Sequence, residues 1–388
     1  MPRRRATSAE LQERDLEIQR VLGCGTSGVV YLGMWRGLSV AVKTLVVPDV
    51  SAAEGRAHQR AALEAAISMS MGHPNVVATY TYQLKPLVHE QQAAAGSRAL
   101  GSGGTTSQSA GPSQVAHDGK AVVEIGGDAY KLYIVQELCN GGTLRQALAQ
   151  GVAGSVRAGG SSRLLALRLA LDVAQGMRHV HSCRIVHGDL KPDNVLLRYK
   201  ADDDGLLKDG TDLASTTATG AGGGGDGSVP LVAKVADFGL SLALAEGATH
   251  ASHHFHGTPA YVAPEVFAEG RVSTRADVWS FGLMLIELFY GCTLEDMRAL
   301  APAATATAGL ALSIHQALLQ DMLATSQRYG KLASDCLSVD VHARPDFVTI
   351  TARLLEVLTT SGASYSEAQN PDGLKHGRFV WPAQPGLA

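Results

Sequence analysis

Aromatic residues and charges are both scarce in this chain. Only 5% of its 388 residues are aromatic and 18% are charged, while 45% are hydrophobic. The charges nearly balance, leaving a formal net charge of −3. Because so small a charge attracts no polyanion, we expect no nucleic-acid partner. The hydrophobic content is ample for a core, and the length suits one large or two ordinary domains.

Long apolar runs and evenly paired cysteines are missing too. The longest apolar run, residues 278–290, has about 13 residues and contains Glu287, so it is too short and too charged to span a bilayer. The basic start (MPRRR) is followed by acidic residues rather than an apolar stretch, which argues against a secretory signal and disfavours a transit peptide. We expect a cytoplasmic protein without a membrane span, since five widely spaced cysteines suit a reducing compartment: Cys24, Cys139, Cys183, Cys292 and Cys336.

Two stretches consist mainly of small and polar residues. Residues 90–120 and 201–228 are rich in Gly, Ala, Ser and Thr. Such segments cannot bury enough apolar surface to offset the entropy of ordering, so we predict two disordered insertions. A fold tolerates them because each doubling of loop length costs only about 0.6 kcal/mol.

The remaining sequence changes character once along its length. Strand patterns dominate first, at residues 17–22, 29–35, 38–45, 76–84 and 130–138, with a helix at 54–71. Helical patterns then follow at residues 144–149, 164–181, 277–290, 313–326, 331–337 and 347–358. Residues 195–197 and 231–235 are expected to pair as strands on either side of the second insertion. The sequence therefore predicts a β-rich part followed by a helical part.

A glycine-rich turn and a lysine lie in the β-rich part. Residues 23–30 (GCGTSGVV) match the pattern G-x-G-x-x-G-x-V between two predicted strands. Glycines let such a turn lie close over phosphates, with its backbone N–H groups aimed at the oxygens. A Rossmann site would instead place the turn before a helix. Lys43 ends an apolar strand that runs back toward the turn, so its ammonium is placed to reach the α- and β-phosphates.

The strongest motif is residues 187–194 (HGDLKPDN), followed later by residues 237–239 (DFG). It places a carboxylate, an ammonium and an amide at fixed offsets, with a second carboxylate to come. Asp189 can align a hydroxyl for attack, and Lys191 can neutralise a transferring phosphate. Asn194 and Asp237 offer the hard oxygen ligands that Mg²⁺ prefers. A chance loop would not hold these residues together and in this order.

These motifs resemble those of eukaryotic protein kinases over roughly residues 16–358. The resemblance implies an α+β, bilobal protein-kinase-like fold, with a small antiparallel N-lobe sheet, one key helix and a larger, mainly helical C-lobe. It divides the chain into an extension (1–15), an N-lobe (16–138), a C-lobe (139–358) and a tail (359–388). Residues 34–43 and 335–340 are similar to the tyrosine-kinase-like group, whose Raf-like and mixed-lineage-like members phosphorylate serine and threonine.

The interior lysine needs a counter-charge. The predicted helix at residues 54–71 offers two candidates, Glu64 and Glu54. In kinases the helix that supplies this glutamate precedes an HPN sequence, and the spacing to residues 73–75 favours Glu64. Ser68 stands where the family usually has an apolar residue, so either the helix is looser or Met69 or Met71 fills the gap.

The resemblance also assigns an ATP site. Val30 and Ala41 would cover one face of adenine and Leu196 the other, while the backbone of Glu137 and Cys139 would bond its edge and Gln136 would stand at the gatekeeper position. The nucleotide-binding residues are then Leu22, Gly23, Cys24, Gly25, Thr26, Ser27, Gly28, Val30, Ala41, Lys43, Gln136, Glu137, Cys139 and Leu196. Asp189, Lys191, Lys43 and Glu64 would be catalytic, and Asn194 and Asp237 would bind Mg²⁺.

A second set of residues resembles the substrate-docking region. Residues 257–265 (GTPAYVAPE) are similar to the end of an activation segment, and Thr258 together with Lys191 indicates a Ser/Thr acceptor. Glu265 is expected to form a buried ion pair with Arg344. Asp277 would hold the backbone of the catalytic loop.

Gly188 departs from the family, which usually has arginine there. That arginine attracts a phosphate on the activation segment and so orders the segment. We therefore expect activity that depends little on phosphorylation between Leu240 and His256, although Ser241, Thr249 and Ser252 are candidate sites. Loss of activity on replacing all three with alanine would contradict this.

The function expected is Mg²⁺- and ATP-dependent phosphorylation of Ser/Thr in a protein substrate, in signalling. The alternative is a pseudokinase that binds nucleotide or partners without efficient transfer, although Lys43, Asp189 and Asp237 are all present. A kinase of small molecules is disfavoured by the docking segment.

Overall fold

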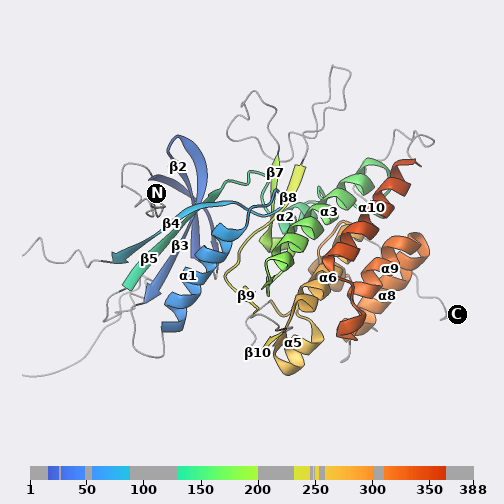
Figure 1. Ribbon diagram of the computed structural model, residues 1–388. Coiled ribbons are helices and arrows are strands. Elements are labelled where there is room, and N and C mark those ends of the chain that lie inside the picture. Colours follow the sequence, from blue (N-terminus) through green and yellow to red (C-terminus); the bar gives the residue numbers. More distant parts are fainter. Residues whose placement is uncertain are drawn as a thin grey trace, which may run out of the picture.

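The computed structural model describes residues 16–25, 28–48, 55–87, 129–199, 231–244, 248, 250–252, 258–300 and 310–363. Within these residues an antiparallel sheet stands at one end of the molecule and a group of helices at the other (Figure 1). The predicted α+β architecture, with a β-rich part followed by a helical part, is confirmed. Both predicted insertions and the predicted extension lie outside the described residues.

The sheet has five strands in the order β1-β2-β3-β5-β4. Neighbouring strands are antiparallel throughout. Helix α1 (Gly55–Ser70) packs against β3 and β4, and Ala65 on the helix is buried with Leu132 and Ile134 of β5. The strands are β1 (Leu16–Gly25), β2 (Gly28–Trp35), β3 (Leu38–Pro48), β4 (Thr79–Leu87) and β5 (Ala129–Glu137).

The helical part is organised around α6. Nearly every side chain of this helix is buried, and it contacts α3, α8 and α9. Its first turn is capped by Ser273, whose hydroxyl oxygen accepts from the Arg275 N–H, and Gly291 ends it with φ 72°. The helices are α2 (Leu144–Ala149), α3 (Gly160–Ser182), α5 (Pro264–Glu269), α6 (Thr274–Tyr290), α7 (Leu294–Ala299), α8 (Leu310–Thr325), α9 (Gln327–Cys336) and α10 (Phe347–Ala363).

Short strand pairs frame the loops of the helical part. The predicted pairing across the second insertion is confirmed, as β7 joins β8 in antiparallel register. Two further pairs, β6 with β9 and β10 with β11, were not predicted because each strand has only two residues. The strands are β6 (Ile185–Val186), β7 (Val195–Tyr199), β8 (Leu231–Val235), β9 (Leu242–Ala243), β10 (Ala251–Ser252) and β11 (Arg271–Val272).

Several predicted boundaries are wrong by a few residues. β4 begins at Thr79 rather than at residue 76, because the preceding residues bond to the helical part instead: Val77 N donates to Val235 O at 2.9 Å, and Val235 N donates to Asn75 O at 2.9 Å. Helix α10 continues past the predicted end at Leu358 into the predicted tail and reaches Ala363. The two bonds with Val235 join the segment between α1 and β4 to β8, and so connect the sheet to the helical part.

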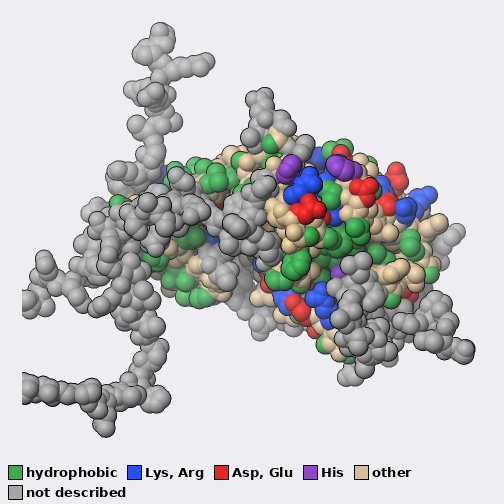
Figure 2. All heavy atoms as spheres, turned by 90° about the horizontal axis from the view of Figure 1, so that it is seen from below, with side chains coloured by type: hydrophobic (Ala, Val, Ile, Leu, Met, Phe, Trp, Pro, Cys, Tyr) green, Lys and Arg blue, Asp and Glu red, His purple; other side chains and the backbone are tan. Residues whose placement is uncertain are grey.

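Charges of both signs are interspersed over the described helical part on the face seen in Figure 2. Across the residues that the structure describes, no helix is both long enough and apolar enough to cross a membrane.

Candidate active site

Lys43 on β3 lies between two carboxylates. Its Nζ is 2.5 Å from Oε1 of Glu64 on α1 and 2.8 Å from Oδ1 of Asp237, which follows β8. Lys43 and Glu64 are buried, whereas the side chain of Asp237 is 28% exposed. The predicted Lys43–Glu64 ion pair is therefore present, and the alternative, Glu54, lies outside the described residues.

The charge of Lys43 is fixed by these neighbours. Burial alone would lower the pKa of Lys43, because it removes the ammonium from water. The carboxylates of Asp237 and Glu64 outweigh burial and raise the pKa above its ordinary value. The ammonium therefore stays protonated at neutral pH and holds two carboxylates near one point.

Ser68 lies on α1 at the position where the family usually has an apolar residue, with Met69 and Met71 nearby in sequence. Ser68 is buried, and so is Met71, which belongs to the main hydrophobic core. Met69 is 47% exposed. Of the two methionines, Met71 is therefore the buried one.

The catalytic loop, residues 187–194, is held from beneath by α6. Asp277 is almost completely buried, and its two carboxylate oxygens accept from the N–H groups of His187 and Gly188, each at 2.9 Å. His181 Nε2 lies 2.8 Å from Asp277 Oδ2. The predicted contact of Asp277 with the loop backbone is confirmed. A helix that is buried along most of its length thus fixes the position of the catalytic loop.

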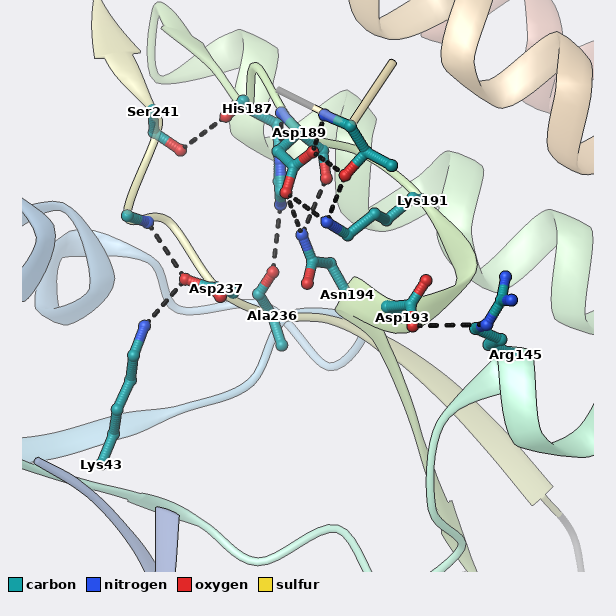
Figure 3. Close-up of polar contacts among 12 residues, drawn as sticks. Lys43, Arg145, His187, Asp189, Lys191, Asp193, Asn194, Ala236, Asp237 and Ser241 are labelled. Atoms are coloured by element: carbon teal, nitrogen blue, oxygen red, sulfur yellow. Dashed lines mark hydrogen bonds and ion pairs between the residues drawn. The ribbon is translucent and has the colours of Figure 1, made fainter. Parts of the chain in front are cut away.

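Both oxygens of Asp189 are engaged, as Figure 3 shows. Oδ2 accepts from Lys191 Nζ at 2.7 Å and from Asn194 Nδ2 at 3.1 Å. Oδ1 accepts from the N–H and the hydroxyl of Thr258, at 3.1 and 3.0 Å. Lys191 also donates to Thr258 Oγ1 at 2.5 Å. The docking segment and the catalytic loop therefore meet at this carboxylate.

Asn194 and Asp237 have the donor chemistry of a magnesium site. Figure 3 shows them flanking Ala236, whose N–H donates to the Asn194 carbonyl at 2.9 Å. The Asn194 amide nitrogen is committed to Asp189, so its side-chain oxygen is the atom available to a cation. A carboxylate oxygen and an amide oxygen are hard ligands of the kind that Mg²⁺ takes. Asp237 also has a left-handed backbone, φ 62°, a strained conformation that is common at functional sites.

The glycine-rich turn is open where a ligand would approach. A Cβ placed on Gly23 or Gly25 would meet no atom within 4 Å, and Cys24 between them is exposed. Gly28 differs: its φ is +111°, and a Cβ there would come within 2.3 Å of the Thr44 carbonyl oxygen. The third glycine is thus required by the hairpin itself. Thr26 and Ser27, also predicted to contact nucleotide, lie outside the described residues.

Comparison with known proteins adds the family to this geometry. The protein kinase domain matches residues 120–354, more than half of the chain. This chain belongs to the protein kinase family. The resemblance stated from the motifs is confirmed.

Two of the similar curated proteins are human mitogen-activated protein kinase kinase kinases. The kinase is 27% identical over 352 residues to mitogen-activated protein kinase kinase kinase 11 of Homo sapiens, with 88% of this chain and 31% of that protein covered. It is 26% identical over 364 residues to mitogen-activated protein kinase kinase kinase 10 of Homo sapiens, with 91% of this chain and 28% of that protein covered. The chain spans about a third of the length of these relatives.

The residues predicted around adenine line the junction between sheet and helices. In the kinase, Ala41 pairs with Gln136, and Leu196 bridges to Thr143; Val30, Ala41 and Leu196 are all half-buried. The Gln136 amide donates to Thr79 Oγ1 at 3.1 Å, so it is held against the neighbouring strand. Leu22 on β1 is exposed.

Cys139 is a poor nucleophile in this position. Burial raises the pKa of its thiol to about 12, so almost no thiolate forms at neutral pH. The predicted role of its backbone at the adenine edge is independent of the thiol.

The ion pair predicted below the docking segment is present. Arg344 is completely buried, and its guanidinium donates to both oxygens of Glu265, at 2.7 and 2.8 Å. Such a two-point contact fixes the end of the segment as well as neutralising both charges.

One charged cluster of the kinase was not predicted. The sequence assigned only the backbone of Glu137, yet its buried carboxylate pairs with Lys234 at 3.0 Å and with Arg198, and accepts from Ala78 N at 3.2 Å. Both basic partners lie on β7 and β8, far away in sequence, so no local pattern could reveal them. This cluster joins the strand that ends at the adenine edge to the helical part.

Proposed function

We propose that this kinase transfers the γ-phosphoryl group of ATP, with Mg²⁺, to a serine or threonine hydroxyl of a protein substrate. The observation that carries the proposal is the pairing of Lys43 with both Glu64 and Asp237, next to an Asp189 engaged at both oxygens. Phosphoryl transfer needs positioned groups and charge stabilisation more than covalent work by the protein.

Each side chain then has a task. Lys43 binds the α- and β-phosphates and is itself positioned by Glu64. Asp189 accepts a hydrogen bond from the acceptor hydroxyl and aligns it with the phosphorus atom, while Lys191 neutralises charge on the transferring group. Asn194 and Asp237 would hold Mg²⁺, which when bound would neutralise charge on the phosphate oxygens.

The contact between Thr258 and Asp189 supports a Ser/Thr acceptor. The docking segment comes within 3.0 Å of the carboxylate through a threonine hydroxyl. We infer that a segment held this close to Asp189 favours a short acceptor side chain over a tyrosine ring. The two human relatives are named as kinases of other protein kinases. These names favour a protein substrate and a role in signalling for this chain as well.

Two broader expectations extend this proposal. We place the kinase domain at about residues 16–358 of the sequence, and the protein in the cytoplasm. The mixed charges seen in Figure 2 and the small net charge fit a protein rather than a nucleic-acid partner.

The test is phosphate incorporation into a generic basic protein from γ-labelled ATP and Mg²⁺, by the purified chain and by Asp237→Asn. The proposal expects labelled phosphoserine and phosphothreonine with the wild-type chain only. Equal labelling by both proteins would refute it. Nucleotide binding by the wild-type chain without any transfer would instead support the pseudokinase alternative.

A further inference from the structure

The activation segment, from Asp237 to Glu265, begins by running antiparallel to the chain that enters the catalytic loop. Leu244 N donates to Arg184 O at 2.9 Å, and β9 pairs with β6, with Leu242 opposite Val186. Two more contacts continue this pairing toward the catalytic loop. They involve Ser241 with His187, and Leu240 with Gly188.

The last of these contacts depends on glycine. Gly188 has φ +78°, and a Cβ added to it would lie 2.8 Å from the carbonyl oxygen of Leu240. That distance is shorter than real Cβ contacts, and the opposing atom is backbone, so it cannot simply rotate away. Glycine therefore lets the two backbones approach where a side chain would hold them apart.

Ser241 makes the adjacent contact with its side chain. It is only 6% exposed, and its hydroxyl donates to the His187 carbonyl at 3.1 Å, as Figure 3 shows. The N–H of the same His187 is bound to Asp277 on α6. Ser241 thus connects the activation segment to the central helix through a single residue of the catalytic loop.

We propose that Gly188 and Ser241 are positioning residues that fasten the start of the activation segment to the catalytic loop without a phosphate. The expected effect on kinase activity, through alignment of the docking segment, rests on the proposed function. The contacts themselves do not depend on it. Gly188 therefore has a positive role, because the absence of a side chain lets its backbone approach the Leu240 carbonyl. The Ser241 hydroxyl then bonds the segment to His187.

The proposal changes the meaning of Ser241 as a modification site. A phosphate on this hydroxyl would remove the donor to His187 and place negative charge beside a carbonyl oxygen in a buried site. Phosphorylation here would therefore weaken activity. Because Ser241→Ala by itself breaks this tie, loss of activity on replacing all three candidate sites would not show dependence on phosphorylation. The double replacement of Thr249 and Ser252 by alanine is the variant that tests that dependence, and it should leave activity unchanged.

The test uses Ser241→Ala, Ser241→Thr and Ser241→Asp in the full chain. We expect Ser241→Ala to exchange the Leu244 amide about fivefold faster, the effect of losing one hydrogen bond, and to lower phosphate transfer at unchanged Mg-ATP binding. Ser241→Thr retains the hydroxyl and should restore both properties. Ser241→Asp should lose more activity than Ser241→Ala. Ser182→Ala is the matched control, because it removes a hydroxyl that donates to the His179 carbonyl away from the segment.

Two results would overturn the inference. One is unchanged exchange at Leu244 in Ser241→Ala, and the other is higher activity of Ser241→Asp than of wild type. Gly188→Ala is an independent test. It should speed amide exchange at Leu244 while the melting temperature of the protein stays close to that of the wild type. Because exchange is measured without substrate, failure of the tie and failure of the proposed kinase activity are distinguishable.

Discussion

The glycine-rich turn and the catalytic loop are two parts of one candidate site built in opposite ways. β1 is exposed along nearly its whole length, and Gly23 and Gly25 have open space beside them. The catalytic loop instead rests on Asp277 and α6, with each oxygen of Asp189 committed to partners. The difference indicates that the turn is built to let a ligand enter and leave, whereas the loop is built to hold one carboxylate in place.

Lys43 belongs to the proposed phosphate-binding part of the site, and its replacement should have the largest effect on phosphate transfer. Lys43→Met removes a charge from between Glu64 and Asp237, and we expect phosphate transfer to fall roughly 10²–10³-fold, as when one stabilising donor is removed from an active site. Lys331→Met, which breaks an exposed pair with Asp335, is the control and should retain full activity. Similar losses in both variants, measured as initial rates, would contradict the assignment.

Replacing Asp277 tests whether support of the catalytic loop matters for phosphate transfer as much as the direct contacts proposed for Lys43. Asp277→Ala leaves the N–H groups of His187 and Gly188 without their acceptor, which should lower stability by about 2–4 kcal/mol. Transfer should fall about 100-fold, because a displaced loop misaligns Asp189. Denaturant unfolding and steady-state rates check these together. Unchanged rates in a folded Asp277→Ala protein would show that α6 does not set the position of the loop.

The glycines sharpen the contrast inside the turn itself. Gly28→Ala should destabilise the protein by about 1–3 kcal/mol, since its φ of +111° and the nearby Thr44 carbonyl do not admit a side chain. Gly25→Ala should leave the melting temperature unchanged and raise the KM for ATP, because its Cβ would enter the space meant for ligand. Equal melting shifts in the two variants would remove this distinction.

Glu287 on α6 gives the smallest effect on transfer but a clear pH signature. Its Oε1 accepts from the Tyr261 hydroxyl at 2.8 Å and from Leu294 N at 3.0 Å, and Oε2 has no partner among the described residues. Burial raises the pKa of this carboxyl to about 8. The folded protein therefore binds the proton more tightly than the unfolded chain does.

The sign of the resulting pH dependence follows directly. The stabilising contribution is complete below the unfolded pKa of 4.5 and is lost as the pH rises through about 8. At about 1.4 kcal/mol for each pKa unit between 4.5 and about 8, its full size is on the order of 5 kcal/mol. Glu287→Gln should flatten this dependence in urea unfolding between pH 5.5 and 8.5. Parallel pH profiles of the two proteins would contradict the raised pKa.

The chemistry could be predicted from sequence because its motifs are local. Asp189, Lys191 and Asn194 lie within one short loop, and the order of strands and helices follows from periodicity. Lys43 and Glu64 could be paired because the strand that carries Lys43 is followed by the helix that carries Glu64, and the spacing from Glu64 to the HPN sequence resembles that of kinases. The predicted roles of these residues await the measurements above.

What could not be predicted arises from contacts between distant segments. Val77 leaves the expected strand because it bonds to Val235, and the Glu137 carboxylate is claimed by Lys234 and Arg198. From sequence Ser241 was a candidate phosphorylation site, yet in the structure it is buried and its hydroxyl donates to the His187 carbonyl. In each case the partner lies far away in the chain, so local pattern holds no signal of it.

Asp189→Asn provides the most direct test of the central claim, that this fixed carboxylate aligns a protein hydroxyl for phosphoryl transfer. The substitution keeps the size of the side chain and leaves Lys43 and Asp237 untouched, and Asn194 retains its bond to the Asp189 carbonyl. Single-turnover transfer from γ-labelled ATP should fall about 10²–10⁴-fold, while the Kd for Mg-ATP stays at the wild-type value. Wild-type transfer rates in Asp189→Asn would contradict the account.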